Sequence, residues 1–268
     1  MSQADLIAQI TKMLSALERI GGAFLGGSFG RGEADDYSDV DVFVVAANAE
    51  DIADVLTELA DNVAKVCPIL FSNVLPNART INSITVDWLR FDFTVVSQAE
   101  LAHFARDQLE PLFDRLAVLE TLPATSAQPP KLPPKALLDV INEFIRVLGL
   151  SVVVKGRDDL IVAQTGTNLL RDMLIRIMVL ENGPQPRRGV LSLKLNLIPD
   201  QIEVLKSLPP PDATWSSVFG RTKVIAEQFF PRARPLAEEL GAVWPEEFER
   251  VTLAYLENEI GLKIDPGR

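Results

Sequence analysis

The sequence has little of three things that whole classes of proteins depend on: cysteine, basic residues and long apolar segments. Its only cysteine is Cys67, which excludes an internal disulfide and a cysteine-based zinc site. Lysine and arginine number 26 against 37 aspartates and glutamates, so the formal net charge is −11. Because proteins that grip nucleic acid by its phosphates need a basic surface, we expect no nucleic-acid partner. The acidic balance leaves room for a cationic small molecule.

No apolar segment approaches the roughly 20 residues that span a bilayer. The richest stretch, residues 136–154, contains Asp139, Glu143 and Arg146. The first residues include Asp5 and lack the apolar core and cleavage site of a secretory signal. We therefore expect no membrane partner and a cytoplasmic location, and a homo-oligomer is compatible with the sequence.

The length of 268 residues suits one large domain or two ordinary ones. A proline-rich segment at residues 122–135 supplies the division, because proline removes backbone donors and neither a helix nor a central strand can run through such a segment. Its prolines are Pro123, Pro129, Pro130, Pro133 and Pro134. We predict a catalytic domain at 1–122, a linker at 123–135 and a second domain at 136–268.

The two predicted domains differ in their hydrophobic period. In the first, apolar residues at helical spacing predict helices at 4–20, 51–64 and 99–107, and short β-branched or aromatic runs predict strands at 23–26, 39–45, 68–73, 81–86 and 90–96. This mixture indicates an α/β (α+β) domain around a mixed sheet. The second domain reads as an all-helical bundle of four or five helices, with one helix at 216–230 that Pro231 and Pro235 stop or kink and a last one near 246–260.

The residues that indicate chemistry lie in the segment 21–45, GGAFLGGSFGRGEADDYSDVDVFVV. Residues two apart in a strand face the same side, so Asp39 and Asp41 project together. Two carboxylates on one face repel each other unless a cation lies between them. Oxygen ligands of this kind suit Mg²⁺, which is often held by carboxylates together with substrate phosphates.

The glycine-rich turn before these acids is suited to an anion. Gly27 and its neighbouring glycines let backbone N–H groups turn toward a phosphate, Ser28 adds a hydroxyl, and Arg31 adds a permanent cation. From the helical half, Lys194 is our candidate for a phosphate contact, because a lone lysine in the apolar stretch 190–198 would need a partner if it were buried.

A third carboxylate, Asp92, lies on the predicted strand 90–96. Alternation places Asp92 on one face and Phe91 and Phe93 in the core. If this strand lies beside the strand at 39–45, Asp92 joins the first two acids in a two-metal site and can accept the proton of an attacking hydroxyl.

The order of these elements resembles the polymerase-β-like nucleotidyltransferase superfamily: an apolar strand, Gly27-Ser28, ten residues, Asp39-x-Asp41 and a later carboxylate strand with Asp92. The segments GGSFGRGEADDYSDVD and RFDFTVVS and the helical second half look like the aminoglycoside (streptomycin-type) adenylyltransferases. The resemblance implies that Gly27 and Ser28 hold the β- and γ-phosphates of ATP or another nucleoside triphosphate. It also implies that Asp39, Asp41 and Asp92 hold two Mg²⁺ ions, and that the helical domain covers the nucleotide and forms much of the acceptor pocket.

The expected reaction is transfer of a nucleoside monophosphate, AMP from ATP, to a hydroxyl of a small molecule, with pyrophosphate released. An aminoglycoside-like, cationic acceptor is the leading candidate. Two alternatives remain: a protein nucleotidylyltransferase that modifies a tyrosine or serine of a partner, and a non-catalytic, antitoxin-type binding module that has kept the fold.

Overall fold

The structure, a computed structural model, describes residues 1–127, 130–184, 193–210 and 212–267. It divides into two compact units, Met1–Ala127 and Gln128–Arg268. The boundary falls inside the proline-rich segment. Each unit has its own hydrophobic core, and the two are described separately below.

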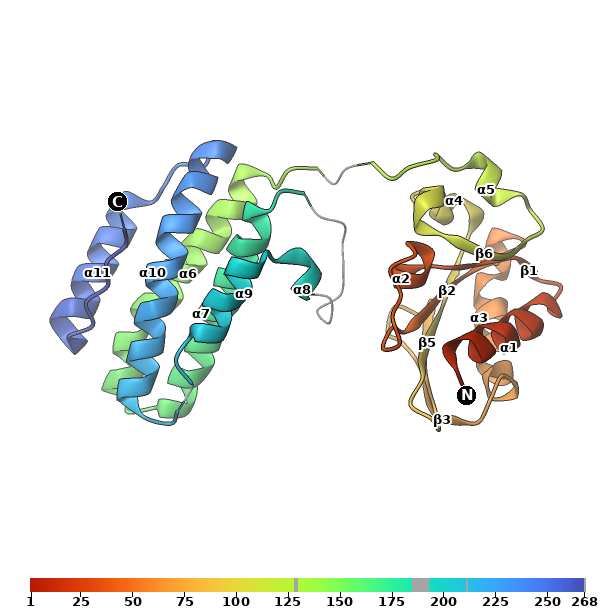
Figure 1. Ribbon diagram of the computed structural model, residues 1–268, viewed down its shortest axis with the longest axis horizontal. Coiled ribbons are helices and arrows are strands. Elements are labelled where there is room, and N and C mark those ends of the chain that lie inside the picture. The colour runs from red at the N-terminus through yellow and green to blue at the C-terminus, as the bar shows by residue number, and fades with distance from the viewer. Residues whose placement is uncertain (128–129, 185–192, 211, 268) are drawn as a thin grey trace. The chain divides into compact units, whose positions relative to one another are not determined.

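A six-stranded sheet forms the centre of the N-terminal unit, in the order β3-β4-β5-β2-β1-β6 (Figure 1). Its strands are β1 (Ile20–Leu25), β2 (Val40–Ala46), β3 (Ile69–Val74), β4 (Thr80–Thr85), β5 (Arg90–Val96) and β6 (Glu110–Asp114). Strands β2 and β5 run parallel, and every other pair is antiparallel. The predicted mixed sheet is therefore confirmed, with β6 as a strand that the sequence analysis missed.

Helices α1 (Gln3–Ser15) and α3 (Ile52–Asn62) cover one face of this sheet. Leu6, Ile10 and Leu14 follow the helical period on α1 and are fully buried against the sheet. The strands present alternate apolar residues to these helices, so the odd-numbered residues of β2 and the even-numbered residues of β5 face the other way. Asp41 and Asp92 belong to that opposite face.

The opposite face is covered only in part. A small cluster that includes Phe24, Val45 and Leu101 packs over β1 and β2 with the short helices α4 (Gln98–Leu101) and α5 (Val118–Thr121). The predicted helix at 99–107 is shorter than expected and gives way to a 3-10 turn at Arg106–Gln108.

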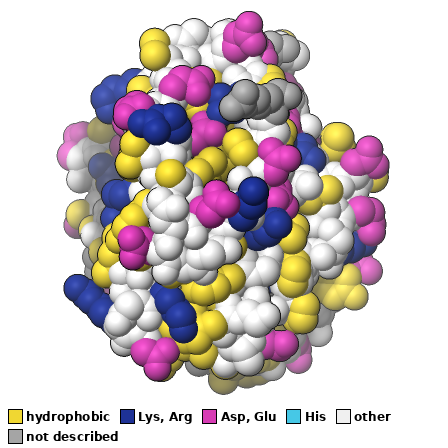
Figure 2. Space-filling model, turned by 90° about the vertical axis from the view of Figure 1, so that its left-hand side faces the viewer, with side chains coloured by type: hydrophobic (Ala, Val, Ile, Leu, Met, Phe, Trp, Pro, Cys, Tyr) yellow, Lys and Arg dark blue, Asp and Glu magenta, His cyan; other side chains and the backbone are white. Residues whose placement is uncertain are grey.

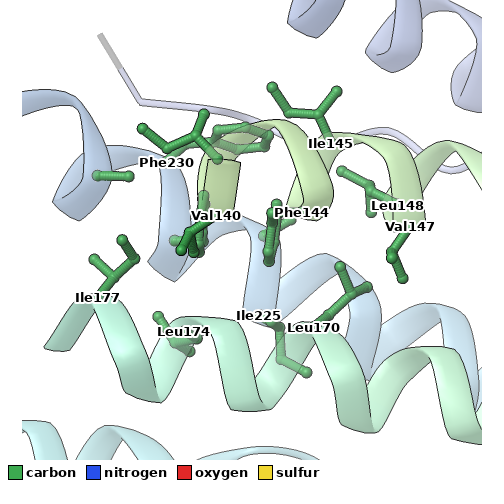
Figure 3. Close-up of a cluster of buried hydrophobic side chains, with 14 of the residues drawn as sticks. Val140, Phe144, Ile145, Val147, Leu148, Leu170, Leu174, Ile177, Ile225 and Phe230 are labelled. Carbon is green, nitrogen blue, oxygen red and sulfur yellow. The ribbon is translucent and has the colours of Figure 1, made fainter. Parts of the chain in front are cut away.

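The C-terminal unit is helical throughout its described part, which confirms the predicted fold class. Its helices are α6 (Pro134–Gly156), α7 (Leu160–Glu181), α8 (Leu193–Asn196), α9 (Pro199–Ser207), α10 (Trp215–Leu240) and α11 (Glu246–Ile260). The core is drawn in Figure 3, where Phe144 of α6 faces the other buried side chains. Its ring stacks on Phe229 of α10, with 3.6 Å between the centroids.

Helix α10 is longer than predicted, which corrects the expectation that it could stop at its prolines. It neither stops nor breaks at Pro231 and Pro235 but runs on to Leu240. An interior proline costs a helix about 3 kcal/mol. Here the buried residues Phe230 and Ala233 lie on both sides of Pro231 in the same core, and that burial offsets the lost backbone hydrogen bonds.

Charges on the helical unit are largely arranged as pairs along single helices. These pairs include Lys135–Asp139, Arg146–Glu143, Lys206–Glu203 and Arg250–Glu247. The face drawn in Figure 2 accordingly shows acidic and basic side chains interspersed, without a large patch of either sign. Pairs of this exposed kind contribute little to stability.

Candidate active site

The glycine turn lies directly against the carboxylate of Asp41. The Gly26 amide donates to the carbonyl of Asp41 at 2.9 Å, which ties the end of β1 to β2. Gly27 has φ +54, and a Cβ added there would lie 1.9 Å from Oδ2 of Asp41. Only glycine therefore fits, for reasons of both backbone conformation and space. The turn and the acid form one local structure.

The side chain of Ser28 lies in this turn without an internal partner. Its hydroxyl oxygen is buried, and no hydrogen bond reaches it from the part of the chain that the structure describes. A buried hydroxyl normally has a partner. An oxygen of a bound phosphate at this turn would supply one. Arg31 follows on the same segment, where its Nε donates to Glu33 at 2.8 Å.

Asp41 and Asp92 are direct neighbours on parallel strands. They are Cα partners in the register of β2 and β5, so their side chains leave the same face of the sheet side by side. Burial raises the pKa of Asp41 to about 6, with further contributions from the negative charges of Asp39 and Asp92. Burial also raises the pKa of Asp92, and a hydrogen bond from Asn82 opposes that rise. The carboxylates of Asp39, Asp41 and Asp92 are therefore close enough to repel one another.

Arg90 is the positive charge nearest to these acids on β5. Its guanidinium lies 3.9 Å from Asp39, and it also donates to the carbonyl of Tyr37 at 3.0 Å. The Asp39 carboxylate therefore forms a long ion pair with Arg90. Within the described ranges, no three His, Cys, Asp or Glu residues are arranged as a set that could hold a metal ion.

The donor chemistry nevertheless suits a hard divalent cation. Asp39, Asp41 and Asp92 offer only carboxylate oxygens, the ligands that Mg²⁺ prefers. Burial is the main reason that the pKa of Asp41 is raised, and a cation between the acids would remove the repulsion that adds to it. For Asp39 to join the other two, it has to exchange its weak contact with Arg90 for the metal.

Several residues outside the acid group can now be placed. Asp35 and Asp36, two acids that precede Asp39 in the sequence, lie in an exposed loop, where Asp35 accepts hydrogen bonds from the Ser38 hydroxyl and the Tyr37 amide. Lys194 is exposed on α8, so the burial on which its prediction depended is absent. Part of the stretch 190–198 lies outside the described residues, and the role of Lys194 stays a prediction. Cys67 is a buried free thiol.

Sequence reasoning missed Asn82 of β4. It is the Cα partner of Asp92 and donates a hydrogen bond to that carboxylate. The predicted strand at 81–86 contains it, but nothing in a single sequence says which strand pairs with which. The signal needed is the register, and only the structure supplies it.

Comparison with known proteins bears on this geometry. Residues 7–90 match the family model of the nucleotidyltransferase domain. The N-terminal unit therefore contains a segment that matches a nucleotidyltransferase domain. The match begins in α1, contains Gly27, Ser28, Asp39 and Asp41, and ends two residues before Asp92. It confirms the predicted resemblance and an enzyme of the nucleotidyltransferase class that transfers a nucleotidyl group.

Solved structures show distant similarity over most of the chain. An aminoglycoside 6-adenyltransferase from Bacillus subtilis is 15% identical, with 94% of this chain and 95% of that one covered and a TM-score of 0.41. A nucleotidyltransferase-like protein from Exiguobacterium sibiricum is 14% identical, with coverage of 96% and 87% and a TM-score of 0.38. Among curated proteins there is no match. Similarity this distant carries no information about the substrate.

The helices also bear on whether the chain could span a membrane. In the described part of the chain, none of them has the length and apolar character required to cross a membrane.

Proposed function

We propose that the nucleotidyltransferase domain moves AMP from ATP to a hydroxyl group of a small molecule, in a Mg²⁺-dependent reaction that releases pyrophosphate. One observation carries this proposal: the register that places Asp41 beside Asp92, with the Gly27 turn packed against the same carboxylate. A phosphate-binding turn and a carboxylate pair in contact are what a metal-bound nucleoside triphosphate requires.

Asp39, Asp41 and Asp92 would hold two Mg²⁺ ions. When bound, these ions would neutralise charge on the phosphates and polarise the α-phosphate toward attack. The turn would bind the β- and γ-phosphates through the Gly27 backbone and the unpartnered Ser28 hydroxyl. Arg31 would add charge from the same segment, and Lys194 is retained as a predicted contact from the helical unit.

Only one chemical step, a proton transfer, is assigned to a side chain of the protein. Asp92 lies at the edge of the acid group toward β4 and accepts the proton that the acceptor hydroxyl loses. The remaining contribution is positioning and charge neutralisation, as in phosphoryl transfer generally. The partner in this proposal is a small molecule and not a nucleic acid.

Incubation with ATP labelled on the α-phosphate and with Mg²⁺ tests the proposal. Label on a small molecule is the expected result. Label on protein would favour a protein nucleotidylyltransferase, and no transfer to either would favour a binding module. Asp39→Asn should abolish the transfer. Asp36→Asn, an exposed acid on the preceding loop, is the matched control and should leave it intact.

A further inference from the structure

A row of polar side chains continues from the acids across the sheet. Asp41 of β2 is the partner of Asp92 on β5, Asp92 is the partner of Asn82 on β4, and Asn82 is the partner of Asn73 on β3. Cross-strand partners leave the same face of a sheet. The two acids and the two amides therefore lie in one line that ends at the edge strand. Because neighbouring strands are about 4.8 Å apart, Asp92 and Asn73 are separated by ~10 Å.

On their own strands, the two amides have neutral surroundings. Neither β3 nor β4 contains a charged residue. Phe71 precedes Asn73 by two residues and pairs with Ile84, so it belongs to the same face, and the residue is 50% exposed. On the other side of Asn82, the hydroxyls of Thr80 and Thr94 are 3.2 Å apart. Amides, hydroxyls, one aromatic ring and the apolar side chain of Ile84 thus make up this surface, and Arg90 of β5 borders it as the partner of Ile84.

This part of the face is open within its own unit. Helices α1 and α3 cover the opposite face, and the cluster with α4 and α5 lies over β1 and β2. Asn73 is exposed, and its side-chain amide makes no hydrogen bond to any described residue. An exposed amide next to a partly exposed ring is available to a ligand.

The order of the strands indicates which substrate lies here. The phosphate-binding turn follows β1, on one side of β2, and Asp92 lies on β5, on the other side. In an in-line displacement, the attacking oxygen approaches opposite the leaving pyrophosphate. With the pyrophosphate at the turn, the attacking hydroxyl comes from the side of Asp92, and the acceptor extends over β4 and β3.

We propose that this face of β4 and β3 binds the acceptor as a neutral, hydroxyl-rich ring of the sugar or cyclitol class, an inference that rests on the proposed function. The acceptor oxygen forms a bond to the α-phosphorus, and the bond from that phosphorus to the bridging oxygen breaks, its electron pair leaving with pyrophosphate. The acceptor proton passes to the Asp92 carboxylate. Asn82 and Asn73 bind hydroxyls farther along the ring system, and Phe71 packs against its apolar side.

The side chains account for the choice of a neutral acceptor. An amide offers both a donor and an acceptor, which matches the two roles of a hydroxyl. An ammonium group offers only donors and gains most from a carboxylate. Beyond Asp92 the row contains amides alone, so an aminated ring has no ion pair to make there.

A panel of matched acceptors tests this inference on the full chain. D-glucose is compared with D-glucosamine, and myo-inositol with a monoamino analogue, each with Mg²⁺ and α-labelled ATP. The neutral member of each pair should be used better. Asn73→Ala should raise KM for the neutral acceptors roughly 2- to 10-fold, the value of one hydrogen bond. Asn73→Asp should shift the preference toward the aminated members at least tenfold, because it adds a carboxylate to the row. Asn258→Ala, an exposed amide on α11, is the matched control.

Two results separate the failure of this inference from that of the proposed function. Folding and nucleotide binding are followed in every variant by the rise in melting temperature with Mg²⁺ and ATP. If the parent chain shows no such rise, the proposed function itself is wrong. The neutral-acceptor site is overturned, and the nucleotide site stands, if the rise is present but the label goes only to aminated acceptors or to no acceptor of the panel. The same holds if Asn73→Ala transfers label to the neutral acceptors as well as the parent does.

Discussion

Asp41→Asn should stabilise the metal-free protein while it destroys the activity. In the folded chain, burial and the neighbouring acids raise the pKa of Asp41 from 3.8 to about 6. A group that is harder to ionise in the folded state than in the unfolded state costs stability whenever it is ionised. Asparagine keeps the shape of the side chain and removes that cost.

The size of the effect follows from the shift. A pKa difference of this size corresponds to about 3 kcal/mol at most, and partial exposure to solvent reduces the expected gain to ~1–2 kcal/mol. The sign depends on pH. Below the unfolded value of 3.8 both states hold the proton and the penalty is absent. It grows as pH rises through about 6 and is complete above that value, so the gain from Asp41→Asn should be full at pH 8 and small at pH 4.

The measurement is urea unfolding in EDTA at pH 4, 6 and 8, with hydrogen exchange of peptides from β2 and β5 to isolate the N-terminal unit from the helical one. Asp36→Asn, in the exposed loop, serves as control and should change little. An Asp41→Asn protein that is no more stable than its parent at pH 8, or whose advantage is the same at pH 4, would refute the claim that clustered, buried acids strain this site.

Three further predictions concern the turn, the metal and the helical core. Gly27→Ala should abolish transfer and lower the free energy of unfolding by about 2 kcal/mol, because the new Cβ meets the Asp41 carboxylate. Gly32→Ala, also at positive φ but with nothing within 4 Å of the new Cβ, should lower it by about 1 kcal/mol and retain activity. Urea unfolding and the transfer assay measure the two effects in both variants. EDTA should abolish label transfer without unfolding the chain by circular dichroism, and added Mg²⁺ should restore it. Glu249→Gln should destabilise the helical unit by about 2 kcal/mol, because buried Glu249 binds Arg234 and Trp244, whereas exposed Glu247→Gln should have almost no effect on the melting temperature.

Local chemistry was readable in the sequence where a pattern determines geometry. The spacing of Asp39 and Asp41 predicts one face, and the alternation of 90–96 predicts that Asp92 is opposite Phe91 and Phe93, as the structure shows. Both inferences need only the period of a strand. The fold class followed from the same periods.

Long-range arrangement was not readable in the same way. Strand β6 contains Pro111 and two acids, and its sequence does not look like a strand until β1 pairs with it. The prolines of α10 were expected to stop or kink the helix, and it does not stop at them because core packing offsets their cost. The exposure of Lys194 and the row from Asp92 to Asn73 depend on which elements meet, which a single sequence does not contain.

The row also changes the expected acceptor. The family resemblance implied an aminoglycoside-like molecule, and the net charge left room for a cationic one. Apart from Arg90, however, the side chains that adjoin Asp92 on this face of β5, β4 and β3 are neutral. The net charge of −11 is a property of the whole chain, while the acceptor contacts only a few side chains. The net charge therefore does not determine which acceptor binds.

Calorimetric titration of ATP into the protein, with Mg²⁺ and then with EDTA, tests the central claim most directly. The account predicts binding with Mg²⁺ that is lost in EDTA, and loss of that binding in Asp41→Asn while Asp36→Asn binds as the parent does. Equal binding in EDTA, or an Asp41→Asn protein that still binds Mg²⁺ and ATP like the parent, would contradict a metal–nucleotide site built on these carboxylates.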